Sequence, residues 1–332
     1  MQRTDSIDIE RAKADAKSSR CRRTSKLEQE AYREGTKIVG FPDSSAWTTE
    51  QKMLEYVKCK NDPVYFLKTY GVISQPIQGR TLFTLYPFQE ELLRTFCDHK
   101  NVIVSKSRQM GISMITAGFT AWLSIFHSDQ TIFVLTTKNE TAKLFLEKVK
   151  LIYSYTPKWM KPTTNHWFQT ELALSNGSLV VAKGGSKVDA IHSRALSLFV
   201  AEECAFIPDM EKHLEVISPT ITTKGKMFLV STPNAPQGFF YDICMRAKAK
   251  TKSLKVLSNL YPNKFIANAK FDFHLVELPW NAHPERNQIW YDKLCSLFNN
   301  NQRLIERELN ANFVSEPNNT LKKNLSQLLR RL

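Results

Sequence analysis

The sequence has no apolar run long enough to cross a membrane, and residues 1–30 lack the apolar core of a signal peptide. Its six cysteines are scattered without a C-x-x-C pair, which favours reduced cytosolic thiols over a disulfide framework or a zinc site. Acidic residues are few, 32 against 46 basic ones, which gives a formal charge of +14. This balance favours a polyanionic partner such as nucleic acid, but a merely soluble basic protein fits the charge equally well.

The 332 residues, 42% of them hydrophobic, suffice for one large domain or two modest ones. Between residues 102 and 234, apolar runs alternate with helical patterns. The predicted strands are Val102–Val104, Thr131–Thr136, Ser178–Ala182, Leu196–Ala201 and Met227–Ser231. The predicted helices are Met114–Phe126, Glu140–Tyr155 and Met210–Ile217. This alternation predicts an α/β fold with a mostly parallel sheet covered by helices on both faces.

Further helices are predicted on either side of this core. Residues 48–72 read as one helix, and residues 89–97 as another that is opened by a proline in its first turn. The predicted apolar anchors of the first helix are Leu54, Val57, Phe66 and Leu67. Towards the C-terminus, helices are predicted at Glu285–Asn299 and Gln302–Asn312.

The most informative stretch is VIVSKSRQMGISMITA at residues 102–117, an apolar strand, a polar loop and an apolar helix. In a phosphate-binding loop of this kind, backbone N–H groups and a helix N-terminus face a polyphosphate. The usual pattern G-x-x-x-x-G-K-[ST] is not met, because Ile112 stands in the lysine position before Ser113. Lys106 stands at the start of the loop instead, and its long side chain can reach the same phosphates from the other end. The loop is therefore either a variant or a degenerate nucleotide site.

Two adjacent carboxylates, Glu202 and Glu203, follow the predicted strand Leu196–Ala201. Ligands bind at the carboxyl ends of parallel strands, so these carboxylates are expected close to the loop that follows Val104. In nucleotide hydrolysis the first carboxylate can hold Mg²⁺, and the second can orient or deprotonate the attacking water. Adjacent acids alone are more often a solvated turn, but behind a phosphate-type loop they favour hydrolysis.

Two other segments suit the same chemistry. Ser231–Asn234 offers hydroxyls and an amide that can sense a γ-phosphate, although S-T-P-N is also an ordinary turn sequence. Upstream of the loop, Gln89 has the donor and acceptor needed to read an adenine edge, and Tyr86 can stack on the base. The alternative for this second segment is a helix start with a surface glutamine.

Taken together, these motifs resemble the ATPase domain of the large terminase subunit, the DNA-packaging motor of tailed phages. SRQMG at 107–111 resembles the Walker A core, and Lys106 is similar to the lysine of the lambda-like branch, which precedes the loop. LFVAEECAFI at 198–207 resembles the Walker B segment, with Glu202 in place of the usual aspartate. The other matches are the adenine motif at Tyr86–Gln89, the coupling motif at Ser231–Asn234 and the domain end at residues 280–291. The resemblance covers about residues 60–316.

The resemblance implies a P-loop NTPase of the RecA/ASCE type, with helical N- and C-terminal extensions, that uses ATP and Mg²⁺. Ser113 and Glu202 would hold Mg²⁺, and Glu203 would act on the water. Arg108 or Arg194 would neutralise charge on the transferred phosphoryl group; Arg194 ends the segment IHSR, where many relatives have Ile-Arg-Gly. The implied nucleotide contacts are Tyr86, Gln89, Lys106, Ser107, Gln109, Met110, Gly111, Ile112 and Ser113. The implied coupling residues are Ser231, Thr232, Pro233 and Asn234.

The expected organisation is a basic mobile arm at 1–45, an ATPase domain at 46–316 and a linker with a short basic helix at 317–332. The ATPase domain divides into a core at 83–240 and a C-terminal subdomain at 241–316. The family continues into an RNase H-like nuclease domain, whose metal ions need carboxylates, whereas residues 317–332 contain no acidic residue. The nuclease domain is therefore expected to be absent; it would be a separate gene product, or the chain would be truncated.

The resemblance further implies a homo-oligomeric ring on the portal protein of a procapsid, pumping double-stranded DNA. Other implied partners are the small terminase subunit and a separate nuclease subunit, with no membrane. The expected location is the host cytoplasm and, transiently, the portal vertex, but not the mature virion. DNA would be held through its phosphates. Its predicted contacts are Lys248, Lys250, Lys252 and Lys255, although a lysine run is more often a solvated face.

Two rival functions remain open. A helicase-type ATPase needs a second ATPase-like domain, for which residues 245–332 are too few and too irregular. A degenerate ATPase that acts as a scaffold for a separate nuclease is favoured by Ile112 and Glu202, and opposed by Lys106 and Glu203.

Overall fold

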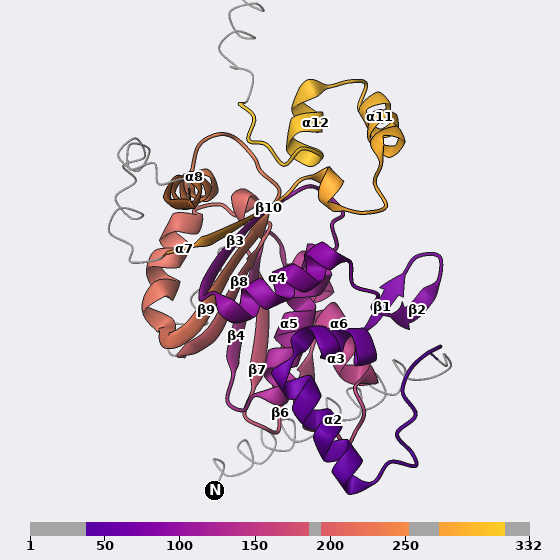
Figure 1. Cartoon of the computed structure of the whole chain (residues 1–332). Helices are drawn as coiled ribbons and strands as arrows, with labels where there is room; N and C mark the ends of the chain where they lie inside the picture. Colours follow the sequence, from indigo (N-terminus) through magenta and orange to yellow (C-terminus); the bar gives the residue numbers. More distant parts are fainter. Residues whose placement is uncertain (1–37, 186–193, 252–271, 316–332) are drawn as a thin grey trace, which may run out of the picture.

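The computed structural model describes residues 38–185, 194–251 and 272–315 (Figure 1). Most of the predicted N-terminal arm and the whole predicted C-terminal linker and helix lie outside these residues. Within the described part of the chain, no helix has the length and apolar character needed to span a membrane.

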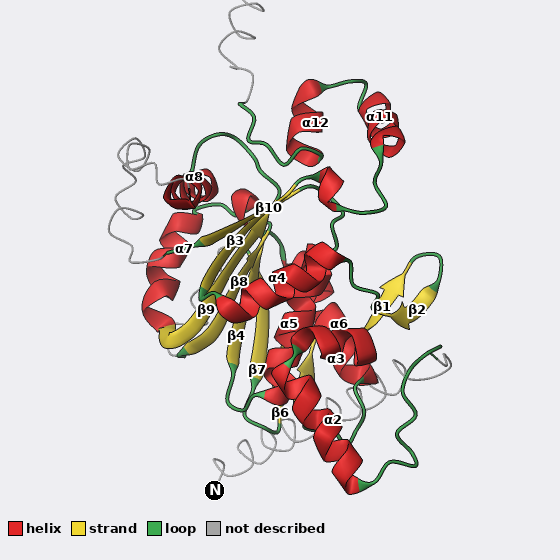
Figure 2. Cartoon of the chain, in the orientation of Figure 1, coloured by secondary structure: helices red, strands yellow, loops and turns green. Residues whose placement is uncertain are grey.

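A single eight-stranded sheet occupies the centre, in the order β10-β3-β9-β8-β4-β7-β6-β5 (Figures 1 and 2). The strands from β10 to β7 in this order are parallel to their neighbours, whereas β6 and β5 are antiparallel. The strands are β3 (Asn101–Lys106), β4 (Thr131–Thr136), β5 (Thr164–Phe168), β6 (Glu171–Leu174), β7 (Leu179–Gly184), β8 (Leu196–Glu202), β9 (Ile221–Ser231) and β10 (His274–Leu278). The predicted α/β fold with a mostly parallel sheet is confirmed.

Helices cover both faces of this sheet (Figure 2). One face carries α2 (Thr49–Asn61), α3 (Pro63–Tyr70), α4 (Pro87–Asp98), α5 (Ile112–Phe126) and α6 (Asn139–Tyr155), and the other carries α7 (Met210–Ile217) and α8 (Phe239–Thr251). The strands divide their side chains accordingly: Val102 and Val104 join the core under α4 and α5, whereas Ile103 joins the core under α7 and α8. Because successive side chains point to opposite faces, a strand buried on both sides is apolar throughout.

The predicted helix at 48–72 is two helices. Asp62 breaks it, because this residue has extended backbone angles and its side chain accepts the N–H groups of Val64 and Tyr65 at the start of α3. Phe66 and Leu67 are buried as predicted, but Leu54 and Val57 are exposed. These last two anchors are wrong because α2 packs through its other face, where Glu55 and Cys59 are buried.

The C-terminal part returns to the end of the sheet where β3 stops (Figure 1). It contains β10, the 3₁₀ turn η4 (Trp280–Ala282), α11 (Gln288–Leu297) and α12 (Gln302–Glu308). Both helices are shorter than predicted. The side chain of Asn287 caps α11, so this helix begins at Gln288 and not at Glu285. Left-handed backbones at Asn299 and Ala311 are incompatible with the predicted C-terminal ends of α11 and α12. The smaller elements are the hairpin β1 (Val72–Gln75) and β2 (Gly79–Leu82), and the 3₁₀ turns η2 (Cys204–Phe206) and η3 (Ser218–Thr220).

Candidate functional site

The strand order brings the three predicted motif loops together. β9 lies between β3 and β8, and the register pairs Ser105 with Ser231 and Val230 with Glu202. The three strands therefore end level with one another at their carboxyl ends. One further strand, β9, thus separates the strand that precedes the loop from the strand that ends in the carboxylates.

The loop after β3 forms a nest of backbone amides. Gln109 and Gly111 have left-handed backbones, with φ of 57° and 73°. Among the hydrogen bonds of the described residues, none is donated by the N–H groups of Gln109, Met110 or Gly111. Successive amides in such alternating conformations make an anion-binding concavity, which the N-terminus of α5 extends.

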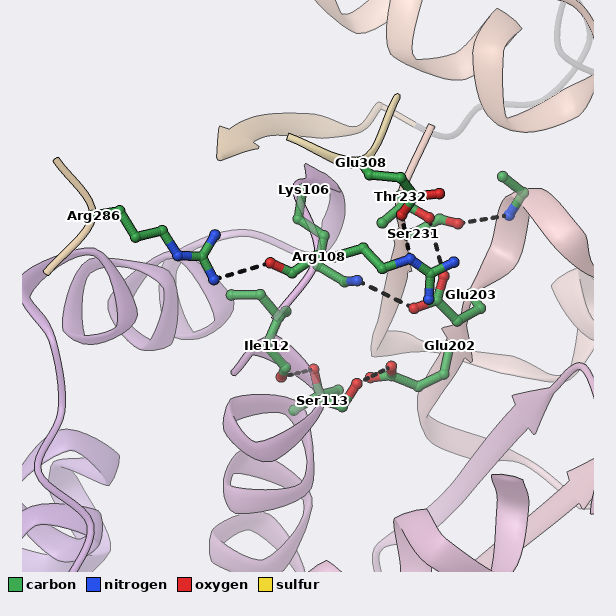
Figure 3. Close-up of polar contacts among 12 residues, drawn as sticks. Lys106, Arg108, Ile112, Ser113, Glu202, Glu203, Ser231, Thr232, Arg286 and Glu308 are labelled. Carbon is green, nitrogen blue, oxygen red and sulfur yellow. Dashed lines mark hydrogen bonds and ion pairs between the residues drawn. The ribbon is translucent and has the colours of Figure 1, made fainter. Parts of the chain in front are cut away.

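Lys106 joins this loop to the carboxylates. Its ammonium Nζ lies 3.1 Å from Glu203 Oε1, and its side chain reaches this contact from the last position of β3 (Figure 3). Lys106 is only 6% exposed. The Thr232 hydroxyl donates to the other Glu203 oxygen at 3.4 Å, and Glu203 itself has a left-handed backbone. The predicted lysine, water-activating glutamate and coupling residue thus meet at one point.

Glu202 and Ser113 face each other beside this point. The Ser113 hydroxyl donates to Glu202 Oε2 at 2.8 Å, while the buried Glu202 Oε1 has no hydrogen-bond partner (Figure 3). Burial raises the pKa of Glu202, although the Ser113 hydrogen bond and the charge of Lys106 oppose this shift. A hydroxyl and a carboxylate with an orphaned oxygen fit a hard cation such as Mg²⁺, which takes oxygen ligands. The longer glutamate therefore still reaches the serine of the loop.

The two predicted arginines lie in different places. Arg108 is half exposed beside the loop, where its guanidinium pairs with the buried Glu308 carboxylate. The backbone N–H of Arg108 donates to the backbone carbonyl of Glu308 at 2.9 Å. Arg194 precedes the first residue of β8, so it lies at the amino end of the strand whose carboxyl end holds Glu202. The structure does not bring Arg194 to the site of its own chain.

A cavity of about 620 Å³ lies next to the loop. Its lining includes Tyr86, Gln89, Gly111 and Lys148, and residues of β1 close another side. Gln89 is 3% exposed; its amide donates to the Met110 carbonyl at 3.0 Å and accepts the Tyr86 N–H at 3.1 Å. The alternative of a surface glutamine is wrong, because this side chain supports the loop. A role of Gln89 and Tyr86 in reading adenine stays a prediction.

The coupling segment is built into the same edge. Ser231, Thr232 and Pro233 are buried, and the Ser231 hydroxyl accepts the N–H of Ala205, two residues after Glu203, at 3.1 Å. The Asn234 carbonyl accepts the Val314 N–H at 3.2 Å. The segment therefore connects the carboxylate strand with the C-terminal part, which an isolated surface turn would not do.

Sequence reasoning missed several residues of this site. Arg286 contacts four residues of the loop, Glu308 binds Arg108, and Lys148 lines the cavity and acts electrostatically on Glu202. Arg286 was matched only as part of the domain end at residues 280–291, and none of the three was given a role, because each comes from a different helix or turn. Of the predicted DNA contacts, Lys248 pairs with Glu277 at 2.8 Å. Lys252 and Lys255 lie outside the described part of the structure, and so does the side chain of Lys250.

Solved structures of phage terminases share this fold. The ATPase domain of the large terminase of Thermus phage P74-26 superposes with a TM-score of 0.51 at 19% identity, covering 70% of this chain and 95% of that domain. A point variant of the same domain gives a TM-score of 0.53 at the same identity and coverage. The large terminase of a thermophilic bacteriophage gives 0.52 at 11% identity, and this match covers 70% of this chain and 54% of that one. The chain thus spans about half the length of that terminase.

The sequence itself carries the family assignment. Residues 103–323, about two thirds of the chain, match the family described as "Terminase large subunit, T4likevirus-type, N-terminal". The match begins in β3 and takes in the phosphate loop, the two carboxylates and the coupling segment. The chain therefore belongs to the terminase large-subunit family, in its T4likevirus-type N-terminal part.

Proposed function

We propose that this protein binds and hydrolyses ATP at the carboxyl ends of β3, β9 and β8. The observation that carries the proposal is the convergence of Lys106 on Glu203, and of Ser113 on Glu202, beside a loop with unpaired amides. The adjoining cavity of about 620 Å³ has the size of a small-molecule site. Membership of the terminase family supports the same reading.

Each residue has a role that follows from its place. The amides of Gln109, Met110 and Gly111 bind phosphate oxygens, and Lys106 adds a positive charge from the opposite end of the loop. Ser113 and Glu202 would hold Mg²⁺, which neutralises charge on the phosphates when bound. Glu203, which is partly exposed, orients the attacking water and accepts its proton.

The motor function goes one step further. We propose that hydrolysis drives translocation of double-stranded DNA into a procapsid, in a ring of copies docked on a portal protein. The formal charge of +14 supports contact with DNA phosphates. The hydrogen bond from Thr232 to Glu203 and the one from Val314 to the Asn234 carbonyl support coupling of the site to the C-terminal part. Partnership with a small terminase subunit and with a separate nuclease, and a place in the host cytoplasm and on the portal vertex, belong to the same proposal.

The first test is ATP turnover by the purified chain with Mg²⁺, with and without double-stranded DNA. Glu203→Gln is the informative variant, because it keeps the shape of the side chain and removes the base. Turnover by the wild type that Glu203→Gln abolishes supports the proposal. Absence of turnover with DNA, portal-bearing procapsids and the other packaging proteins present would refute it.

One observation favours a second function, that of a degenerate ATPase acting as a scaffold for a nuclease. Ile112, in the usual lysine position, is 1% exposed and belongs to the core under α4 and α5. The scaffold reading predicts ATP binding without turnover. The turnover assay therefore separates the two functions, provided that ATP binding is measured on the same preparation.

A further inference from the structure

The outer side of the phosphate loop is held by one side chain, that of Arg286. Its guanidinium donates to the Gln109 carbonyl at 2.8 Å and to the Arg108 carbonyl at 3.1 Å. It also donates to the Ser107 hydroxyl at 3.2 Å and approaches the Met110 sulfur at 3.3 Å. Arg286 lies between η4 and α11, some 180 residues along the chain from the loop that it contacts.

These contacts fix which way the loop amides face. A trans peptide is planar, so its C=O and the following N–H point in opposite directions. The described residues have no cis peptide bond. Because Arg286 holds the carbonyls of Arg108 and Gln109, the N–H groups of Gln109 and Met110 must face the other side. Gln89, on the Met110 carbonyl, does the same for the N–H of Gly111.

Arg286 is itself held by the C-terminal part. Its guanidinium lies 4.4 Å from the ring centroid of Trp290 on α11. The Trp290 ring in turn stacks with the ring of Trp280, which also stacks with that of Tyr291. Such a stacked guanidinium keeps its planar fork in one orientation. A lysine in this position could not hold two carbonyls in the same geometry.

We propose that Arg286 is a positioning residue of the ATP site, which keeps the amides of Gln109 and Met110 directed at the phosphates and ties them to α11. This inference rests on the proposed function, since it names a residue that shapes the same site. It also makes Trp290 a reporter of the loop, because the two are joined through one guanidinium.

The test compares the wild type with Arg286→Ala, Arg286→Lys and the control Lys293→Ala. Lys293 is exposed on α11 and has no ion pair in the described structure, so its replacement removes the same charge from the same segment. Thermal melts come first, then the KM and kcat for ATP, and the Trp290 emission on addition of ATP. Trp290→Phe identifies which part of the tryptophan signal belongs to that residue.

We expect Arg286→Ala to raise the KM for ATP about tenfold, while kcat changes by less than about threefold because Lys106 and Glu203 are untouched. Arg286→Lys should fall between this variant and the wild type, and Lys293→Ala should match the wild type. The Trp290 response to saturating ATP should disappear in Arg286→Ala.

Other outcomes overturn the inference. An unchanged KM in a folded Arg286→Ala variant would show that the loop keeps its shape without the arginine. If Arg286→Ala and Arg286→Lys both lower the melting temperature and leave the KM of the folded fraction unchanged, Arg286 is a structural staple only. A wild type that does not bind ATP refutes the proposed function instead, and this inference with it.

Discussion

Replacing Lys106 by methionine tests the shifted lysine directly, because methionine keeps an unbranched stem and removes the charge. In the structure the Lys106 ammonium lies 3.1 Å from Glu203 and also acts on the buried Glu202. Without it, two adjacent carboxylates stand in a largely buried site with no cation in hydrogen-bond contact. The change therefore removes a charge from the phosphate site and leaves like charges uncompensated.

The two consequences have different sizes. Loss of one preorganised charge at a phosphoryl-transfer site costs turnover a factor of about 10²–10³, or about 3–4 kcal/mol of barrier. The cost in stability is smaller, about 2 kcal/mol, because Glu203 is about a quarter exposed and water replaces part of the lost pairing. The expected loss of turnover is therefore larger than the loss that this decrease in stability would cause by unfolding part of the protein.

The assay is DNA-stimulated ATP turnover, measured below the melting temperature of each variant. Lys100→Met is the matched control: Lys100 is exposed just before the other end of β3, where it bonds to the Thr223 carbonyl. We expect the control to keep wild-type turnover. If Lys106→Met also keeps it, the shifted-lysine interpretation is wrong, and Lys148 in the adjoining cavity becomes the cation to test.

Other changes separate the parts of the site. Glu203→Gln should abolish turnover while ATP binding, measured by equilibrium titration, stays within about threefold of the wild type; weakened binding would instead assign Glu203 a structural role. Gly111→Ala places a Cβ on a left-handed backbone with φ of 73°, 2.6 Å from the Gln89 amide nitrogen. We therefore expect the free energy of unfolding to fall by about 1 kcal/mol, and the same equilibrium titration to show weaker ATP binding. Ile112→Lys restores the usual motif yet puts a charge into the core, so we expect a loss of about 3 kcal/mol or more in denaturant unfolding and no gain in turnover; a more active enzyme would contradict this. Burial lowers the pKa of His127 below its ordinary 6.5, so its contribution to stability is full above pH 6.5 and is lost as the pH falls through the folded value. Melts between pH 8 and pH 5.5 should show a smaller loss for His127→Gln than for the wild type, and equal losses would refute the assignment.

Five parallel strands of the sheet, β3, β4, β7, β8 and β9, were predictable because their signals are local, whereas β5, β6 and β10 were not predicted. Thr131–Thr136 and Met210–Ile217 agree with the structure residue for residue, since each is one uninterrupted apolar or amphipathic pattern. The position of the candidate site also followed from local signals. Each predicted strand ends at its motif residues, and the carboxyl ends of parallel strands lie at the same edge of the sheet. Lys106, Ser113 and Glu202 were placed by this rule without any knowledge of strand order.

What was missed depends on contacts between distant parts of the chain. β10 pairs with β3, and Glu308 pairs with Arg108 across 200 residues, yet neither has a marker in its own segment. The exposure of Leu54 followed from how α2 docks, which its helical periodicity does not determine. Arg194 was proposed from its neighbours in sequence, whereas its distance from the site follows from the direction of β8. The positions of β10, Glu308, Leu54 and Arg194 are therefore set by the tertiary structure and not by the sequence around each of them.

The strand order also supports the proposed role of the lysine before the loop. With β9 between them, β3 and β8 lie about 10 Å apart, at about 4.8 Å per strand spacing. The side chains of Lys106 and Glu203 extend towards each other from the ends of β3 and β8 and meet with the ammonium 3.1 Å from the carboxylate, while Ile112 belongs to the packing of α5. The two positions are therefore not interchangeable within one backbone. Motif spacing alone favours a degenerate site, whereas the structure places the Lys106 charge between the loop and the carboxylates, where the proposed ATP site needs a cation.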